Sequence, residues 1–146
     1  MEGVGKVVLA VGVYDTADIL ADYLDWYLHI GVDFIVALEY GSTDGSVDIL
    51  KRYERAGVLH WRCNPSHNYS RHNPFDAIAA VARDEFEADW IIVCDTDEFL
   101  VTDDRSLSGA ISDAIREEIS VLSIPTSRTC LSAPDAAHRL SDSAGC

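Results

Sequence analysis

The sequence predicts an α/β fold in which helices cover both faces of a mostly parallel sheet, a three-layer sandwich. Strand-like and helix-like hydrophobic patterns alternate three times before residue 90. This order is typical of strand–helix–strand units, whose crossovers are nearly always right-handed. The strand candidates are near-continuous apolar runs, as expected for strands that are buried on both faces.

The composition limits both the size and the partners of the protein. At 146 residues with 48 % hydrophobic content, the chain can form one packed domain and is too short to expect two. Its formal net charge of −14 disfavours binding to nucleic acids and to anionic lipids, because like charges repel. An anionic nucleotide could still bind if a cation or local arginines masked the carboxylates.

The cysteines indicate a reducing compartment. Cys63, Cys94, Cys130 and Cys146 show no paired spacing, and Cys94 lies inside an apolar run as a small core residue.

The sequence shows no signal-peptide pattern and no apolar run long enough to span a bilayer. We therefore expect a cytoplasmic protein with no membrane segment in this chain. Any association with a membrane would need regions that are not present in it.

The first predicted strand is the valine-rich run 6–13, and a helix follows it. Asp15 or Thr16 can cap this helix, and Gly31 can end it. Because Gly5 precedes the strand, it cannot belong to a dinucleotide-binding fingerprint, and no Walker-type loop is present. The apolar positions of the helix recur every three or four residues, at Leu20, Tyr23, Leu24, Tyr27 and Ile30.

A second strand is predicted for residues 32–39, with Glu39 at its carboxyl end. The loop 40–46 is small and polar, with turn-forming residues throughout. A second helix follows to Ala56, and Gly57 is its stop signal. The apolar face of this helix carries Val47, Leu50 and Tyr53.

A short third strand is predicted for residues 58–62, and the polar segment 63–72 is interpreted as a surface loop. The next helix has a strong start signal, with Asn73 as cap, Pro74 at the first helical position and Asp76 in the first turn. Its apolar stripe consists of Phe75, Ile78, Ala79, Ala82 and Phe86.

The fourth predicted strand is the apolar run that begins at Trp90. A helix within 103–118 and a strand at 119–125 complete the pattern, whereas 126–146 weaken into loop or tail. We therefore assign residues 1–125 to the folded domain and 126–146 to a weakly patterned tail. The inward positions of the last helix are Leu107, Ala110, Ile111, Ala114 and Ile115.

Three carboxylates follow the fourth strand within four positions, at Asp95, Asp97 and Glu98. Asp95 and Asp97 can turn toward one point, and two hard oxygen ligands suit Mg²⁺ or Mn²⁺. Alternatively, one aspartate caps the next turn and the other is solvated. In a right-handed parallel topology, Glu39 and the 40–46 loop emerge at the same edge of the sheet as these carboxylates. We expect a ligand site at this edge.

Four segments of the chain resemble, in the same order, segments of GT-A glycosyltransferases. They are similar to family 2 and especially to the family 92-like branch. The resemblance covers roughly residues 7 to 101. The segments are 17–20 (ADIL), 28–33 (LHIGVD), 41–46 (GSTDGS) with Ile49 and Leu50, and 95–100 (DTDEFL).

The resemblance implies a Rossmann-like GT-A fold, of which this chain would hold a truncated form. It also implies a UDP- or GDP-sugar as donor, Mn²⁺ or Mg²⁺ as cofactor, and a glycan, lipid or protein as acceptor. Asp97, together with Asp95, matches the family's metal-binding aspartates. The positions that match the family's nucleotide-binding positions are Val13, Tyr14, Asp15, Glu39, Asp44, Arg71 and Asp95.

The chain departs from the family in three places. Relatives usually have Lys-Asn-Glu or Arg-Asn-Glu before the first helix, where this chain has VYDT at 13–16, and Asn or Asp in place of Tyr40. The acceptor-side half normally follows the acidic motif, but only 102–146 remain here, so 126–146 would be its start. The catalytic base is not identified. Candidates by residue type alone are Asp103, Asp104 and Asp135.

Several residues have simpler roles that stay open. Glu39 can cap its own turn, Asp44 can be the N-cap of the second helix, and Glu98 can pair with a surface base or with solvent. His67 and His72 could suggest a metal site, but no suitable third ligand is near them in sequence. Core positions are the interpretation for Tyr23, Tyr27 and Tyr53.

Two other functions fit parts of the pattern. An apolar strand that ends in Asp-x-Asp is also typical of haloacid dehalogenase-type phosphatases, in which Asp95 would be the nucleophile and Asp97 the acid/base. That motif normally follows the first strand, and its fifth position here is Phe99. The altered 13–16 segment and the missing acceptor half are also compatible with a degenerate domain that binds a nucleotide or a partner without turnover.

Overall fold

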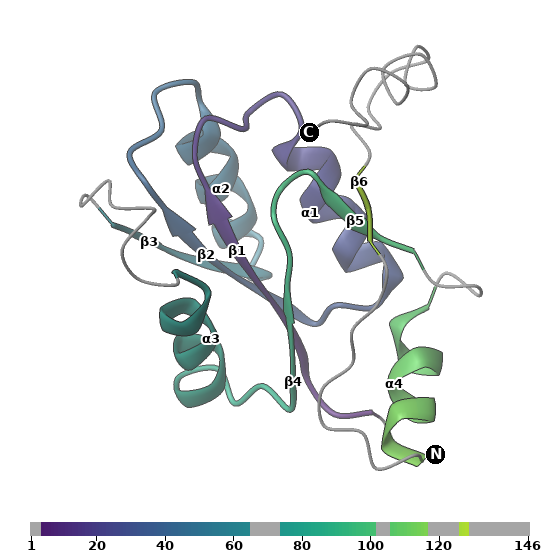
Figure 1. Cartoon of the computed structure of the whole chain (residues 1–146). Coiled ribbons are helices and arrows are strands. Elements are labelled where there is room, and N and C mark those ends of the chain that lie inside the picture. The colour runs from purple at the N-terminus through teal and green to yellow at the C-terminus, as the bar shows by residue number, and fades with distance from the viewer. Residues whose placement is uncertain (1–3, 65–73, 102–105, 117–125, 129–146) are drawn as a thin grey trace.

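The computed structural model describes residues 4–64, 74–101, 106–116 and 126–128 (Figure 1). Within these ranges, strands and helices follow one another in the predicted alternation as far as β4. The elements are β1 (Val7–Val13), α1 (Leu20–Ile30), β2 (Phe34–Glu39), α2 (Ser46–Arg55), β3 (Leu59–Cys63), α3 (Pro74–Asp84), β4 (Trp90–Val93), β5 (Glu98–Leu100), α4 (Leu107–Arg116) and β6 (Thr126–Arg128).

Four strands form one parallel sheet in the order β3-β2-β1-β4, through three strand pairings. In its register Val13 lies level with Glu39, and Glu39 lies level with Cys63. β4 is set back, since its last residue Val93 lies level with Ala10 of β1. The chain therefore has to run on past β4 before it reaches the edge at which β1 and β2 end.

Side chains of β1 alternate between two apolar clusters, one on each face of the sheet. Leu9 and Val11 pack into the cluster that includes α1 and α2 residues, whereas Val8 and Ala10 pack into the cluster that includes α3. Both sets are fully buried, as expected for a central strand with period-two alternation. The predicted three-layer α/β fold is confirmed (Figure 1).

The start of α1 differs from the prediction. The helix begins at Leu20 with Ile19 at the N-cap, and no side chain caps it. The backbone N–H groups of Ile19 and Leu20 instead donate to the Thr16 carbonyl, forming a preceding turn. The predicted caps are therefore wrong. The predicted end is confirmed, because Gly31 adopts a left-handed conformation at φ 119°, which glycine reaches without strain.

The carboxyl-terminal part contains a second, two-stranded antiparallel sheet of β5 and β6, in which Glu98 pairs with Arg128 and Leu100 with Thr126. Strand β6 lies in the segment predicted to be loop, so that prediction is wrong at residues 126–128. The predicted last helix is confirmed over the shorter range of α4, with Leu107 and Ile111 buried. The predicted strand 119–125 lies outside the described residues.

Of the helices in the described ranges, none combines the length and the apolar character needed to cross a lipid bilayer.

Candidate functional site

The carboxyl ends of the parallel strands meet at one edge of the sheet, which carries the candidate site. The β1–α1 loop follows Val13, the β2–α2 loop follows Glu39, and the acidic loop, residues 94–98, follows β4. Because β1 lies between β2 and β4, the β1–α1 loop is the central one of the three. The predicted common edge is confirmed, and it is the edge at which open α/β sheets bind ligands.

The β1–α1 and β2–α2 loops are hydrogen-bonded to each other through Asp15. Its carboxylate accepts a hydrogen bond from the Thr43 N–H at 2.7 Å, and its own N–H donates to the Ser42 hydroxyl at 2.9 Å. Asp15 holds this position with φ 46°, in the left-handed region that aspartate tolerates better than most residues. Tyr14, next to it, is 52 % exposed, whereas Val13 is buried. Asp15 therefore connects two loops instead of capping α1.

Asp44 forms a second connection between the same two loops. Its carboxylate accepts hydrogen bonds from the Ala17 N–H at 2.9 Å and from the Ser46 hydroxyl at 2.7 Å. The Ser46 hydroxyl in turn accepts from the Thr16 N–H at 3.0 Å. The hydroxyl of Ser46 and the N–H of Ala17 lower the pKa of Asp44, because both donate to its ionised form. The N-cap of α2 is Gly45, so the suggestion that Asp44 occupies it is wrong.

Glu39 is a buried carboxylate, with 2 % of its surface exposed. One oxygen accepts a hydrogen bond from the Ser42 N–H, and the other lies 3.6 Å from the Cys63 thiol, which donates to it. Burial by itself raises the pKa of Glu39, but the N–H groups of Ser42 and Gly41 bring it below its ordinary value. These contacts agree with the simpler of its two suggested roles, that of closing the turn after β2.

The acidic loop closes on itself through Glu98. The Glu98 carboxylate accepts a hydrogen bond from the Asp95 N–H at 3.2 Å, and the Glu98 N–H donates to the Asp95 carbonyl at 3.0 Å. Glu98 was expected to pair with a surface base or with solvent, and its bond to the Asp95 N–H was not predicted. Asp97 is half-buried, and its side chain makes no hydrogen bond or ion pair with any other described residue. Its carboxylate is thus available to a ligand within the described part of the chain.

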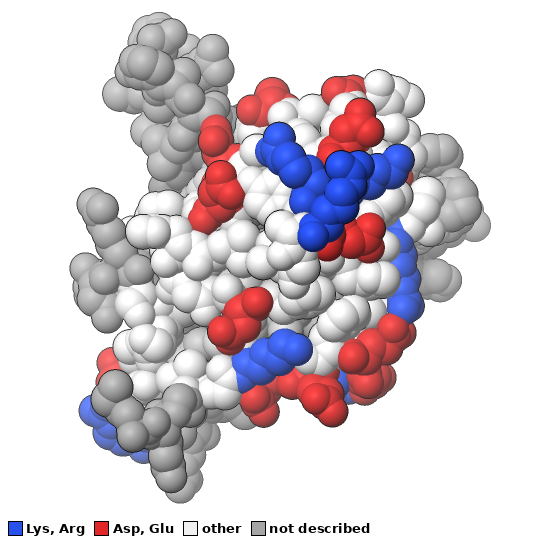
Figure 2. Space-filling view, turned by 180° about the vertical axis from the view of Figure 1, so that it is seen from behind, with Lys and Arg blue, Asp and Glu red and all other residues white. Residues whose placement is uncertain are grey.

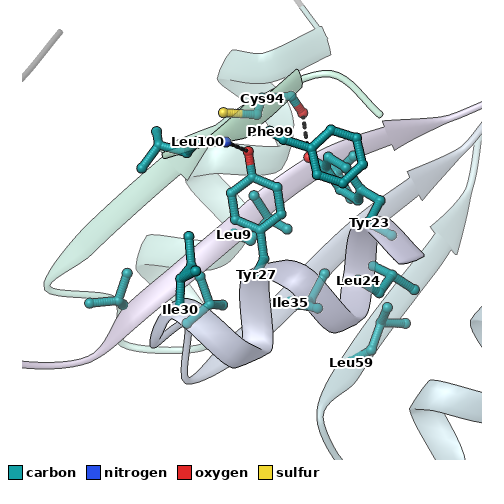
Figure 3. Close-up of a cluster of buried hydrophobic side chains, with 14 of the residues drawn as sticks. Leu9, Tyr23, Leu24, Tyr27, Ile30, Ile35, Leu59, Cys94, Phe99 and Leu100 are labelled. Carbon is teal, nitrogen blue, oxygen red and sulfur yellow. Dashed lines mark hydrogen bonds between the residues drawn. The ribbon is translucent and has the colours of Figure 1, made fainter. Parts of the chain in front are cut away.

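Helix α1 fixes the ends of the acidic loop through two tyrosine hydroxyls (Figure 3). The Tyr23 hydroxyl donates to the Cys94 carbonyl at 3.0 Å. The Tyr27 hydroxyl donates to the Glu98 carbonyl at 2.7 Å and accepts from the Leu100 N–H at 3.1 Å. Burial raises the pKa of both hydroxyls well above 10, so they remain protonated donors.

A third contact comes from Trp26, whose indole N–H donates to the Leu100 carbonyl at 2.9 Å. The predicted core positions of Tyr23 and Tyr27 are confirmed, since both are fully buried. The second role of their hydroxyls was not predicted. The available signal was chemical, because a buried tyrosine hydroxyl or indole N–H needs a hydrogen-bond partner.

Asp95 and Asp97 fit the donor set that a diphosphate-bound Mg²⁺ or Mn²⁺ needs from a protein. Such an ion typically takes one or two carboxylates and completes its shell with water and substrate phosphates. No group of three or more His, Cys, Asp or Glu side chains suited to a metal occurs among the described residues. Several predicted site residues lie outside the described ranges, namely Arg71, Asp103, Asp104, Asp135, His67 and His72.

The sequence profile of glycosyltransferase family 92 matches residues 8–136 of this chain. The chain belongs to glycosyltransferase family 92. This match confirms the resemblance found in the sequence and gives no support to the phosphatase alternative, in which Asp95 would be a nucleophile. No curated protein matches the chain in sequence.

Solved structures with a similar fold include TarS of S. aureus. The fragment TarS 1-349 is similar to this family 92 chain with a TM-score of 0.63 at 14 % identity, over 82 % of this chain and 38 % of that one. The same fragment in complex with UDP gives a TM-score of 0.59 at 13 % identity, with the same coverage. TarS itself gives 0.60 at 15 %, over 82 % of this chain and 23 % of its own. The chain thus spans less than two fifths of these proteins.

Proposed function

We propose that this chain is the donor-binding portion of a glycosyltransferase that uses a nucleoside-diphosphate sugar and a divalent metal. The observation that carries the proposal is the acidic loop, which follows β4 at the ligand edge of the sheet with the Asp97 carboxylate available. Family 92 membership supports the transferase reaction. The likeness to the fold of a protein solved with UDP supports UDP as the nucleotide, and GDP is the alternative.

In the proposed complex, Asp97 holds Mn²⁺ or Mg²⁺, and Asp95 bonds the ribose or an ion-bound water. The ion, when bound, would stabilise the negative charge that grows on the leaving diphosphate. The base and ribose would lie on the loop after Val13, where the exposed Tyr14 ring can stack on a base. Asp15, Asp44 and Glu39 would shape this surface, since Asp15 and Asp44 already bond the two loops together and Glu39 closes the turn after β2.

The negative charge of the protein supports the proposal that a cation is needed for a diphosphate to bind. Asp and Glu side chains spread over much of the face in Figure 2, with one gathering of Lys and Arg. Three basic residues, Lys51, Arg52 and Arg55, are exposed on α2 in a chain of net charge −14. A diphosphate that approaches three carboxylates in the acidic loop would be repelled unless a divalent ion compensated them.

The acceptor, a glycan, lipid or protein, and the catalytic base are left open by this proposal. For the location we propose the cytoplasm, which agrees with the free thiols of Cys63 and Cys94.

Isothermal titration of the chain with UDP and with GDP, with and without Mn²⁺, tests the proposal. We expect UDP or GDP to bind with Mn²⁺ and to bind at least tenfold more weakly when a chelator replaces the metal. Absence of binding for both nucleotides, with and without metal, would refute it. Release of free sugar from UDP- or GDP-sugars would further distinguish a catalytic domain from one that only binds.

A further inference from the structure

The acidic loop is fixed to one face of helix α1 at both of its ends. Tyr23 and Tyr27 lie one helical turn apart on that face, as residues at i and i+4 do. The Tyr23 hydroxyl binds the carbonyl directly before Asp95, and the Tyr27 hydroxyl binds the carbonyl directly after Asp97. The two hydroxyls therefore bracket the pair of aspartates proposed to bind the metal and the diphosphate.

We propose that Tyr23 and Tyr27 are positioning residues of the donor site, whose hydroxyls hold the acidic loop in the shape that binds a metal-bound diphosphate. This inference rests on the proposed function. Neither residue would touch the ligand. Each acts through the backbone of the loop, and the loop carries Asp95 and Asp97.

The anchoring elements are rigid, which a positioning role requires. Tyr23 and Tyr27 are fully buried, and their rings pack together with centroids 4.8 Å apart. The Tyr23 ring also meets Phe99 edge-on, at 5.7 Å and 78°. Because Phe99 follows the loop in sequence, the same tyrosine fixes the loop by a hydrogen bond to its first residue and by packing just after its last (Figure 3).

The loop needs such anchors because it concentrates negative charge. Asp95, Asp97 and Glu98 occupy three of four consecutive positions, and their mutual repulsion favours more open arrangements. If the loop sampled such arrangements, the apparent affinity for the metal-bound diphosphate would be lower. It would be the intrinsic affinity multiplied by the fraction of molecules whose loop is in the binding shape. Anchoring by neutral hydroxyls restricts the loop without placing a competing charge in the site.

A positioning role and a role in stability alone predict different results for tyrosine-to-phenylalanine variants. Both roles predict lower stability, because a buried carbonyl loses its donor. Only positioning predicts weaker ligand binding as well. Tyr53 of α2 offers a matched control, since its hydroxyl donates to the Ala21 carbonyl at 3.3 Å and to the Asp25 carboxylate at 2.5 Å, on the same helix and away from the acidic loop.

The experiment compares the full chain with Tyr23→Phe, Tyr27→Phe and Tyr53→Phe, at a temperature at which thermal unfolding shows each one folded. UDP is titrated in the presence of Mn²⁺, and amide hydrogen exchange is followed at residues 94–100. We expect Tyr27→Phe to weaken UDP binding about fivefold to tenfold, as the loss of one net hydrogen bond does. We expect Tyr23→Phe to have a smaller effect and Tyr53→Phe to stay within about twofold. Exchange of the loop amides should rise in the first two variants only.

Two negative results have different meanings. If the unaltered chain binds UDP with Mn²⁺ and both loop-facing variants bind it as well as Tyr53→Phe does, the positioning inference is overturned and the proposed function stands. If the unaltered chain binds neither UDP nor GDP with Mn²⁺, the proposed function itself fails.

Discussion

The loops at the ligand edge of the sheet are held in two different ways. In the β1–α1 and β2–α2 loops, the carboxylates of Asp15, Asp44 and Glu39 accept hydrogen bonds from nearby backbone N–H groups. In the acidic loop, Glu98 accepts one such bond from the Asp95 N–H, but aromatic side chains of α1 hold both ends of the loop from outside, and the Asp97 carboxylate stays available to a ligand. Acidic residues at this edge therefore do one of two things: they bind backbone N–H groups of the loops, or they stay available to a ligand. A carboxylate binds the backbone where unsatisfied N–H groups lie near it.

Asp97→Asn should show the largest effect on binding. We expect the affinity for UDP with Mn²⁺ to fall about a hundredfold, because the ion loses a charged ligand. The free energy of unfolding should change by less than about 0.5 kcal/mol, the usual range for a surface substitution that breaks no contact. Titration calorimetry and denaturant unfolding measure the two quantities.

Asp22→Asn is a suitable control for this experiment, because Asp22 is exposed on α1, outside the loops of the proposed site. It should leave both quantities unchanged. Equal binding by Asp97→Asn and the unaltered chain would show that the acidic loop does not hold the metal.

Glu39→Ala should show the largest effect on stability. We expect a loss of about 2–3 kcal/mol in the free energy of unfolding, since a buried carboxylate disappears and leaves the Ser42 N–H without its acceptor. Urea unfolding followed by circular dichroism measures it. A stability equal to that of the unaltered chain would mean that the turn after β2 is held by other contacts.

The sequence was sufficient for the parts of the fold that depend on local pattern. Alternating apolar runs and helical spacing identified the order from β1 to β4, and the register of parallel strands then required a shared edge. Strands β5 and β6 were not predicted, because each has only three residues, too few to show the alternation of apolar and polar positions that identifies a strand. Local pattern also explains why Gly31 was recognised as a helix end.

Contacts between distant residues explain what the sequence could not predict. Asp15 was expected to cap the helix that follows it, but it bonds to Thr43, which is 28 positions away. The partners of Tyr23 and Tyr27 lie 71 positions away in the chain. Nothing in the spacing of a helix identifies such a partner, although the burial of a tyrosine predicts that one exists.

Asp44→Ala should have a moderate effect on both properties. We expect a loss of about 1 kcal/mol in the free energy of unfolding, at the low end for a charged acceptor because the group is exposed to solvent. Since Asp44 shapes the loops on which the nucleoside would lie, UDP binding should weaken by less than about tenfold. Amide exchange at Ala17 and Ser46 reports the loosening directly. Unchanged exchange at both would show that the two loops do not depend on this carboxylate.

A change in pH should alter the stability of the fold less near neutral pH than any of these substitutions does. The change in stability should grow as the solution becomes acidic. The pKa of Glu39 and that of Asp44 lie below their ordinary values of 4.5 and 3.8 in the folded chain. Each group therefore stabilises the fold above its unfolded pKa, and this contribution is lost as the pH falls through the folded pKa. Thermal unfolding between about pH 6 and pH 3 should show Tm falling less steeply in Glu39→Gln than in the unaltered chain. Parallel curves would contradict the assigned role of Glu39.

Mn²⁺ also provides the most direct test of where the donor site lies, because this paramagnetic ion broadens the NMR signals of nearby nuclei in a chain of 16.0 kDa. With UDP present and Mn²⁺ at substoichiometric concentration, the amide signals of residues 95–98 should broaden first. The same experiment on Asp97→Asn should show little broadening at these positions. Broadening centred on residues 42–46, or broadening that is the same in both proteins, would contradict the assignment of the metal to the acidic loop.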